Sequence, residues 1–175
     1  MSLKANVKNA TYALVNALAP EPEAQADTDI LDTLKKEHDE VKSLLSDLED
    51  AKTSAERRAL VRQIKAALVP HTKAEEKVVY DAVLGLRDKD AQTDGYEGYL
   101  EHEWASKTLE RLGSIANATS PEHKATAKVL KELVEHHIRE EERNIWSDVK
   151  KNFSAEERMQ MNRAFVSAKR RVKRA

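Results

Sequence analysis

The chain has 175 residues, of which 40% are hydrophobic and 35% are charged, and its 30 Lys and Arg nearly balance its 31 Asp and Glu. This length suits one domain with its own hydrophobic core, and the net charge of −1 provides no overall attraction to nucleic acid or anionic lipid. The absence of cysteine excludes disulfides, thiolate catalysis and cysteine-ligated metal centres.

Composition also indicates the fold class. Ala, Leu, Glu, Lys and Arg dominate, and Gly and Pro occur four times each, which favours helices. Aromatic residues make up only 5%, which argues against a β-sandwich and against platforms for stacking bases. No apolar run approaches the roughly 20 residues that a transmembrane helix needs. We therefore expect an all-α protein that does not contact a membrane.

The N-terminal segment, residues 1–26, is expected to be accessory to the main domain. Its first part, Leu3–Leu18, is predicted to form an amphipathic helix, and Pro20–Ala26 has the composition of a linker. A signal peptide is the alternative, but Asn9, Thr11 and Asn16 interrupt its apolar stretch. We therefore expect a cytoplasmic protein.

Two long helices are expected next. The first should be capped by Asp27 or Thr28 and run to about Lys52. The second should be capped by Ser54 and run to about residue 86, with a kink or a local break at Pro70.

Two further long helices and a terminal one should follow. The third is predicted over residues 96–118, after a polar connection that ends at the turn signal Asp94-Gly95. The fourth begins at Ser120-Pro121 and runs to about residue 152. A capping box formed by Ser154 and Glu157 opens a last, basic helix over residues 154–175. The prediction is an up-down-up-down four-helix bundle over residues 27–153, flanked by short accessory helices.

Each long helix has an apolar seam with alternating three- and four-residue spacing, and each seam contains one histidine. These four are His38, His71, His102 and His137. Glu75 and Glu141 each follow a seam histidine by four residues, which places both side chains on one helix face. A lone seam histidine is usually a satisfied core residue. Four histidines and two carboxylates buried together without cations, however, would be strongly destabilising.

We therefore predict a metal site, with a metal-free polar network as the alternative. Imidazole and carboxylate ligands without thiolate suit iron, manganese or zinc. Glutamates on facing helices are able to bridge two metal ions in such bundles. No nucleotide-, flavin- or haem-binding motif is visible, and no catalytic residue is assigned.

The pattern resembles the hemerythrin-like, or HHE, family over about Asp29–Phe153. The resemblance is carried by the segments 34–41 (LKKEHDEV), 71–76 (HTKAEE), 101–103 (EHE) and 137–142 (HIREEE). It implies a four-helix bundle around two iron ions that share an oxo or hydroxo bridge, although manganese or zinc would also suit the ligands.

Carried over position by position, the resemblance implies that one iron binds His38 and His71, the other binds His102 and His137, and Glu75 and Glu141 bridge them. In oxygen-carrying hemerythrins the second bridging carboxylate follows its histidine by five residues, so Glu142 is a rival to Glu141. Regular helix geometry favours Glu141, whereas a π-bulge would favour Glu142.

The chain departs from the oxygen carriers at one ligand. The carriers have a fifth histidine one turn from the position of His102, where this chain has Gly98 and Ser106. Each iron would then keep an open position, so we expect the protein to bind or react with O2, peroxide or NO rather than carry oxygen. The resemblance alone suggests that it does so in a stress response. An iron- or oxygen-sensing module that contacts a protein partner through its accessory helices is the second hypothesis. Nucleic acid is not an expected partner.

Overall fold

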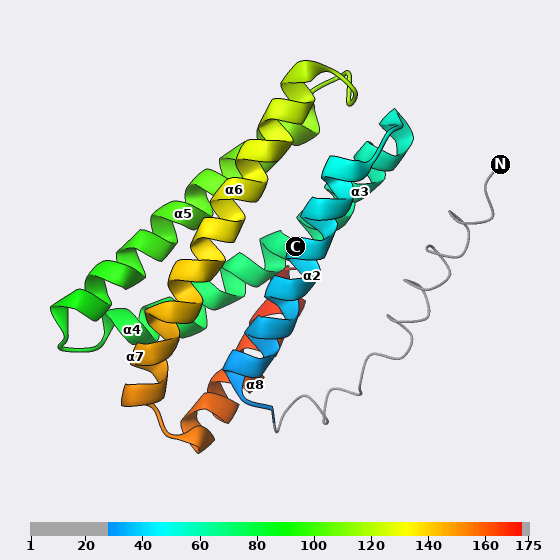
Figure 1. Cartoon of the computed structure of the whole chain (residues 1–175). Helices are drawn as coiled ribbons and strands as arrows, with labels where there is room; N and C mark the ends of the chain where they lie inside the picture. Colours follow the sequence, from blue (N-terminus) through cyan, green and yellow to red (C-terminus); the bar gives the residue numbers. More distant parts are fainter. Residues whose placement is uncertain (1–27, 173–175) are drawn as a thin grey trace.

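The computed structural model describes residues 28–172, and every regular element in this range is helical (Figure 1). The elements are α2 Ile30–Asp50, α3 Ser54–Glu75, the π-helical turn η1 Glu76–Tyr80, α4 Asp81–Leu84, α5 Lys89–Ser114, α6 Pro121–Arg143, α7 Ile145–Asn152 and α8 Ala155–Val172. The all-α prediction is thus confirmed. The helix expected over Leu3–Leu18 and the linker after it lie outside the described residues.

The long helices form two hairpins that pack side by side. One hairpin consists of α2 and α3, the other of α5 and α6, and contacts between α3 and α5 and between α2 and α6 join them (Figure 1). The C-terminal helix α8 packs against α3 and α2. Among the described helices, none combines the length and the apolar character required to span a membrane.

The first two helices are capped one residue away from the positions that we predicted. Asp29, not Thr28, caps α2, because its carboxylate accepts a hydrogen bond from the backbone N–H of Leu31 at 3.0 Å. Thr53, not Ser54, caps α3, because Glu56 stands three residues beyond it and completes a reciprocal capping box. The predicted caps at Ser120 and Ser154 are confirmed.

The third long helix begins seven residues earlier than predicted. Asp88 caps it by accepting hydrogen bonds from the N–H groups of residues 90 and 91, so Asp94 and Gly95 lie within α5. A Cβ atom on Gly95 would lie 3.2 Å from the side chain of Leu84. Gly95 therefore allows α5 to pack closely against α4. The prediction that it forms a turn was wrong.

Two irregularities interrupt the long helices. The helix continues through Pro70 without a break, and the departure from α-helical geometry comes at η1, six residues later. The fourth predicted helix is divided at Asn144, which separates α6 from α7. Both irregularities adjoin the level of the seam histidines.

The seam histidines lie between two hydrophobic clusters. One cluster occupies the end of the bundle where α2 joins α3, and its members include Val41, Leu45, Ile64, Leu109 and Leu130. The other cluster occupies the opposite end and includes Ile30, Leu34, Val79, Ile145 and Phe165. The polar layer is therefore enclosed along the bundle axis by apolar packing on both sides.

Candidate metal centre

The structure brings all six predicted ligand residues into one buried layer. Their exposed fractions range from 0% for Glu75 to 7% for His137. The members of this inner layer are His38, His71, Glu75, His102, His137 and Glu141, and they come from α2, α3, α5 and α6.

Each inner carboxylate reaches one histidine of each predicted pair. Oε2 of Glu75 lies 3.3 Å from Nε2 of His71 and 3.5 Å from Nε2 of His102. Oε2 of Glu141 lies 3.3 Å from Nε2 of His38 and 3.5 Å from Nε2 of His137. Two carboxylates that each stand between two pairs of imidazoles have the arrangement expected of bridging ligands.

The donor atoms also form two overlapping groups of the size of a metal site. His38, His71 and Glu75 supply one group, and Glu75, His102 and His137 supply the other, with the donor atoms of each group within 4.8 Å of one another. Glu75 belongs to both groups. The two groups therefore define neighbouring positions that share a carboxylate.

The inner carboxylates lack the hydrogen bonds that buried carboxylates need. Within the described residues, neither oxygen of Glu75 nor either oxygen of Glu141 accepts a hydrogen bond. An unpaired buried charge of this kind is strongly destabilising unless a cation compensates it. Imidazole Nε2 and carboxylate oxygen are donors that suit iron, manganese and zinc, so the residues present fit a pair of such ions.

A second ring of glutamates faces the outer nitrogens of the four histidines. The carboxylate-to-Nδ1 distances are 3.0 Å for Glu37 and His71, 3.3 Å for Glu76 and His102, 2.7 Å for Glu101 and His137, and 3.1 Å for Glu142 and His38. Each of these outer glutamates comes from a helix next to the one that carries its histidine. By accepting from Nδ1 of His38, His71 and His137, three of these glutamates direct Nε2 of those rings inward and increase its basicity as a ligand. Glu76 lies beside Nδ1 of His102 without a hydrogen bond.

The inner and outer residues form a pattern that occurs twice in the chain. The pair Glu37-His38 on α2 corresponds to Glu101-His102 on α5. The segment from His71 to Glu75-Glu76 corresponds to that from His137 to Glu141-Glu142. Our sequence analysis assigned no role to Glu37, Glu76 or Glu101 and named Glu142 only as a rival bridge. The sequence feature that could have identified these four glutamates is that each directly precedes or follows an inner residue.

Tyr80 is a further residue of the layer that sequence reasoning missed. Its hydroxyl lies 3.4 Å from Nε2 of His102 and 3.4 Å from Nε2 of His137, and the side chain is fully buried. Five residues of regular α-helix would turn Tyr80 about 140° away from Glu75. The wider π-helical turn η1 reduces this rotation, and the side chains of Tyr80 and Glu75 both approach Nε2 of His102.

Gly98 provides the space for Tyr80. A Cβ atom at Gly98 would lie 2.7 Å from Cζ and 2.9 Å from the hydroxyl oxygen of Tyr80. Gly98 is one of the two positions where the resemblance led us to look for a fifth histidine. A phenol from η1 thus occupies the space that a side chain on α5 would otherwise fill.

The electrostatics of the layer show how it is balanced without a metal. Burial lowers the pKa of His71, but the carboxylates of Glu75 and Glu37 outweigh burial and raise this pKa to about 10. Burial raises the pKa of Glu75, but His71 and His102 outweigh it and hold that pKa well below its usual range. Glu75, with the adjacent Glu76, also raises the pKa of His102 against the effect of burial, so the protonated forms of His71 and His102 are favoured beside Glu75 in the metal-free protein.

Tyr80 stays a neutral phenol in this balance. Burial, followed by the negative charges of Glu141 and Glu75, raises its pKa well above the usual range. Its O–H group is then available as a hydrogen-bond donor at the level of His102 and His137.

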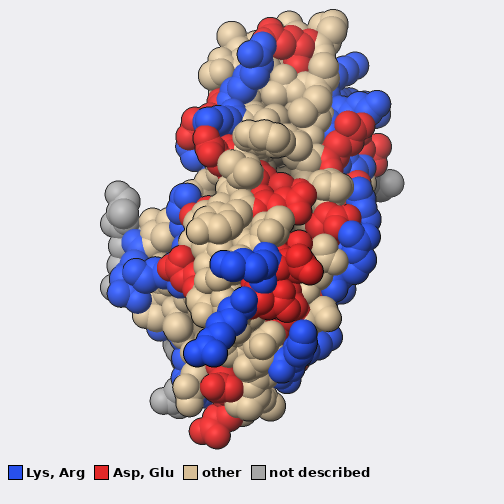
Figure 2. Space-filling view, turned by 90° about the vertical axis from the view of Figure 1, so that its left-hand side faces the viewer, with Lys and Arg blue, Asp and Glu red and all other residues tan. Residues whose placement is uncertain are grey.

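The two C-terminal helices cover the layer. The ring of Trp146 on α7 stacks on His38 with 5.8 Å between ring centroids, and Phe165 on α8 meets the edge of His71 at 5.9 Å. An acidic cleft with room of only about 10 Å³ reaches Tyr80 and His137 between α5 and α6, and Asp94, Glu97 and Glu140 are among its lining residues. On the face that α5 presents in Figure 2, Asp and Glu gather across the middle.

Comparison with known proteins gives two findings. Residues 29–147 match the family described as hemerythrin HHE cation binding domain. The chain is also 28% identical over 146 residues to a DNA nickase of Nostoc sp. (strain PCC 7120), in an alignment that covers 83% of this chain and 40% of that protein. The chain thus spans well under half of this relative's length. No solved structure shows significant similarity to the chain.

Proposed function

This chain belongs to the hemerythrin HHE cation binding family, and we propose that its bundle, with up-down-up-down helices, holds two iron ions that bind or react with O2, peroxide or NO. His38 and His71 would hold one iron, His102 and His137 the other, and Glu75 and Glu141 would bridge them. The observation that carries the proposal is that each of these two carboxylates lies within 3.5 Å of one histidine from each pair.

Paired iron ions supply redox chemistry and coordination positions for small oxygen- or nitrogen-containing ligands. The chain would hold them with six inner side chains, and three outer glutamates keep His38, His71 and His137 in the tautomer whose Nε2 points inward. Trp146 and Phe165 restrict access of water to the His38–His71 side. A role in a stress response rests on the family resemblance.

Tyr80 makes the two halves of the site unequal. We infer that its hydroxyl oxygen is a further ligand for the iron between His102 and His137, because it lies at the same 3.4 Å from both Nε2 atoms. The phenol would release its proton to solvent as it binds. This ligand would leave the open position on the iron between His38 and His71, in place of the one open position per iron that the sequence suggested.

Metal analysis with an absorption spectrum tests the proposal. Protein purified from iron-supplemented cells should contain about two irons per chain, and its ultraviolet and visible bands should change when azide or peroxide is added. Absence of bound metal after careful reconstitution would contradict the proposal and favour a metal-free polar network. Two bound irons whose spectrum is unchanged by azide and peroxide, together with a melting temperature that depends on iron, would favour the sensing module instead.

A further inference from the structure

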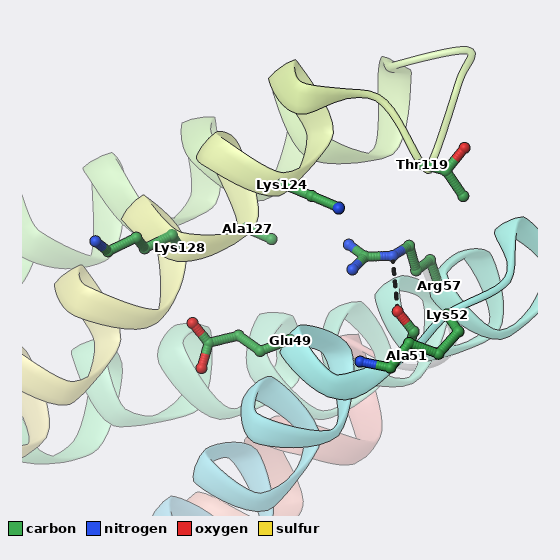
Figure 3. Close-up of a pocket in the computed structure, with 8 residues that line it drawn as sticks. All are labelled: Glu49, Ala51, Lys52, Arg57, Thr119, Lys124, Ala127 and Lys128. Carbon is green, nitrogen blue, oxygen red and sulfur yellow. Dashed lines mark hydrogen bonds between the residues drawn. The ribbon is translucent and has the colours of Figure 1, made fainter.

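A second cavity lies away from the histidine layer, at the end of the bundle where α2 joins α3 and α5 joins α6 (Figure 3). Its volume is about 330 Å³, which falls within the range of pockets for small molecules. The lining residues are Glu49, Ala51, Lys52, Arg57, Thr119, Lys124, Ala127 and Lys128. Four of these eight side chains are cationic and one is acidic. Lys128 points away from the cavity in Figure 3 and contacts Glu132, so Lys52, Arg57 and Lys124 supply its surplus of positive charge.

Arg57 is the residue that makes this cavity more than a surface hollow. Only 4% of the residue is exposed, and its Nε donates to the carbonyl of Ala51 at 3.1 Å. Across residues 28–172, no carboxylate forms an ion pair with its guanidinium. Figure 3 shows the terminal nitrogens of Arg57 directed into the space between the α2–α3 connection and α6. A buried cation without a counter-charge is destabilising, and a bound anion would compensate it.

The neighbours of Arg57 also favour a bound anion. Lys124 reaches from α6 toward Arg57 in Figure 3. The acidic residue of the lining, Glu49, is engaged by Lys131, which lies outside the cavity lining. The cavity also borders the beginning of α6 at Thr119, where the helix dipole adds positive potential.

The buried His123 on α6 is also affected by the positive charge at this end of the bundle. Burial and then the positive charges of Arg57 and Arg58 lower its pKa. The carboxylates at this end are engaged elsewhere, since Glu49 pairs with Lys131, Glu122 pairs with Arg111 and Glu56 accepts from the backbone of Thr53.

We propose that this cavity binds the phosphate group of a small phosphorylated molecule, with Arg57 and Lys124 as its main contacts. A guanidinium donates two parallel hydrogen bonds to a phosphate, and an ammonium adds a mobile charge. The cavity is larger than one phosphate ion, and the side chains of Ala51 and Ala127 line the remainder. The proposal is independent of the metal centre.

Titration calorimetry of the full chain with pyrophosphate and with inorganic phosphate, at constant ionic strength, tests this proposal. We expect saturable binding that is tighter for pyrophosphate. Lys124→Gln and Arg57→Gln should each weaken it at least about tenfold, since a charge-assisted hydrogen bond is lost. Lys150→Gln removes the same charge from an exposed position on α7 and should leave binding unchanged.

Lys124 is exposed, so its variant tests the site even if the Arg57 variant fails to fold. No saturable binding, or equal weakening in the Lys150 variant, would overturn the proposal. A parallel titration with a short DNA duplex separates the two sources of phosphate. Duplex binding that requires Lys124, without any binding of pyrophosphate, would overturn the small-molecule assignment in favour of a polymer backbone.

Discussion

Two adjacent glutamates on α6 have different neighbours. Glu141 lies between His38 and His137. Glu142 faces the outer nitrogen of His38 and the ammonium of Lys35, and no second histidine. We therefore predict that Glu141→Gln lowers the iron content below two per chain even after reconstitution. Glu142→Gln should still take up two irons, but with roughly 10- to 100-fold lower affinity, because only the support of a ligand is lost. Metal analysis across a titration with a competing chelator measures both, and the reverse order would identify Glu142 as the bridge.

The Tyr80 hydroxyl gives a second prediction for a single residue. A phenolate bound to ferric iron absorbs visible light, so Tyr80→Phe should lose a visible band while two irons per chain remain. Tyr99→Phe is the matched control, because Tyr99 packs against the ring of Tyr80 but donates to Glu76 and Asp81 rather than to the histidines. An unchanged spectrum in the Tyr80 variant would show that the phenol only fills space.

Local spacing was sufficient to predict the inner residues but not their partners. A histidine in an apolar seam and a glutamate four residues later are visible within one helix. The contact between Glu101 and His137, or between Glu37 and His71, depends on which helices become neighbours. Tyr80 was not predicted for a different reason. Its inward position requires a π-helical turn, and no residue pattern in the seam predicts one.

The crossing of η1 and α5 gives a prediction for the elements. Gly98→Ala places a Cβ atom 2.7 Å from Tyr80, so either the ring or α5 has to move. We expect the free energy of unfolding to fall by about 1–3 kcal/mol, as for other overpacked cores, together with loss of the visible band assigned to Tyr80. Chemical denaturation of the metal-free variant measures the first effect.

Gly113 is the matched control on the same helix. A Cβ atom there would have no neighbour within 4 Å, so Gly113→Ala should leave stability unchanged or raise it by up to about 1 kcal/mol. Equal losses from both variants would mean that the loss reflects helix propensity or the end of α5, and not the space for Tyr80.

Element boundaries were harder to predict than element types. The turn signal Asp94-Gly95 suggested a connection, but α5 runs through it because Gly95 packs against Leu84. Composition does not distinguish a glycine that turns the chain from one that permits close packing. The division of the fourth helix at Asn144 was likewise not visible in its apolar pattern.

At the scale of the whole molecule, a charged layer lies between two apolar clusters. Its carboxylates need compensating cations, which protonated imidazoles such as His71 supply in the metal-free protein and metal ions would supply in a loaded one. Metal binding to the folded form should therefore raise the melting temperature, since the unfolded chain has no assembled site. Whether the molecule also contacts nucleic acid is a separate question, and our expectation that it does not stays a prediction.

The pH dependence of stability follows from the same exchange of protons for metal. The pKa of His71 rises from 6.5 to about 10 on folding, so the folded state binds this proton more tightly than the unfolded state. The stabilisation is complete below pH 6.5 and disappears as pH rises toward 10. Metal-free protein should therefore lose up to a few kcal/mol of stability over this interval, as measured by denaturant unfolding.

The stabilisation that metal binding adds should increase with pH, whereas the stability of the metal-free protein should fall. Metal ions bind deprotonated imidazoles, so loading releases protons and strengthens as pH rises. The difference in melting temperature between loaded and metal-free protein should widen between pH 6.5 and 9. His136→Gln removes a histidine whose side chain is 53% exposed and whose Nε2 lies 3.4 Å from Oε1 of Glu101. The Gln amide is still able to donate to Glu101, so both trends should remain. Metal-free stability that is constant or rising over this interval would show that the buried imidazoles are neutral, and that another group balances Glu75 and Glu141.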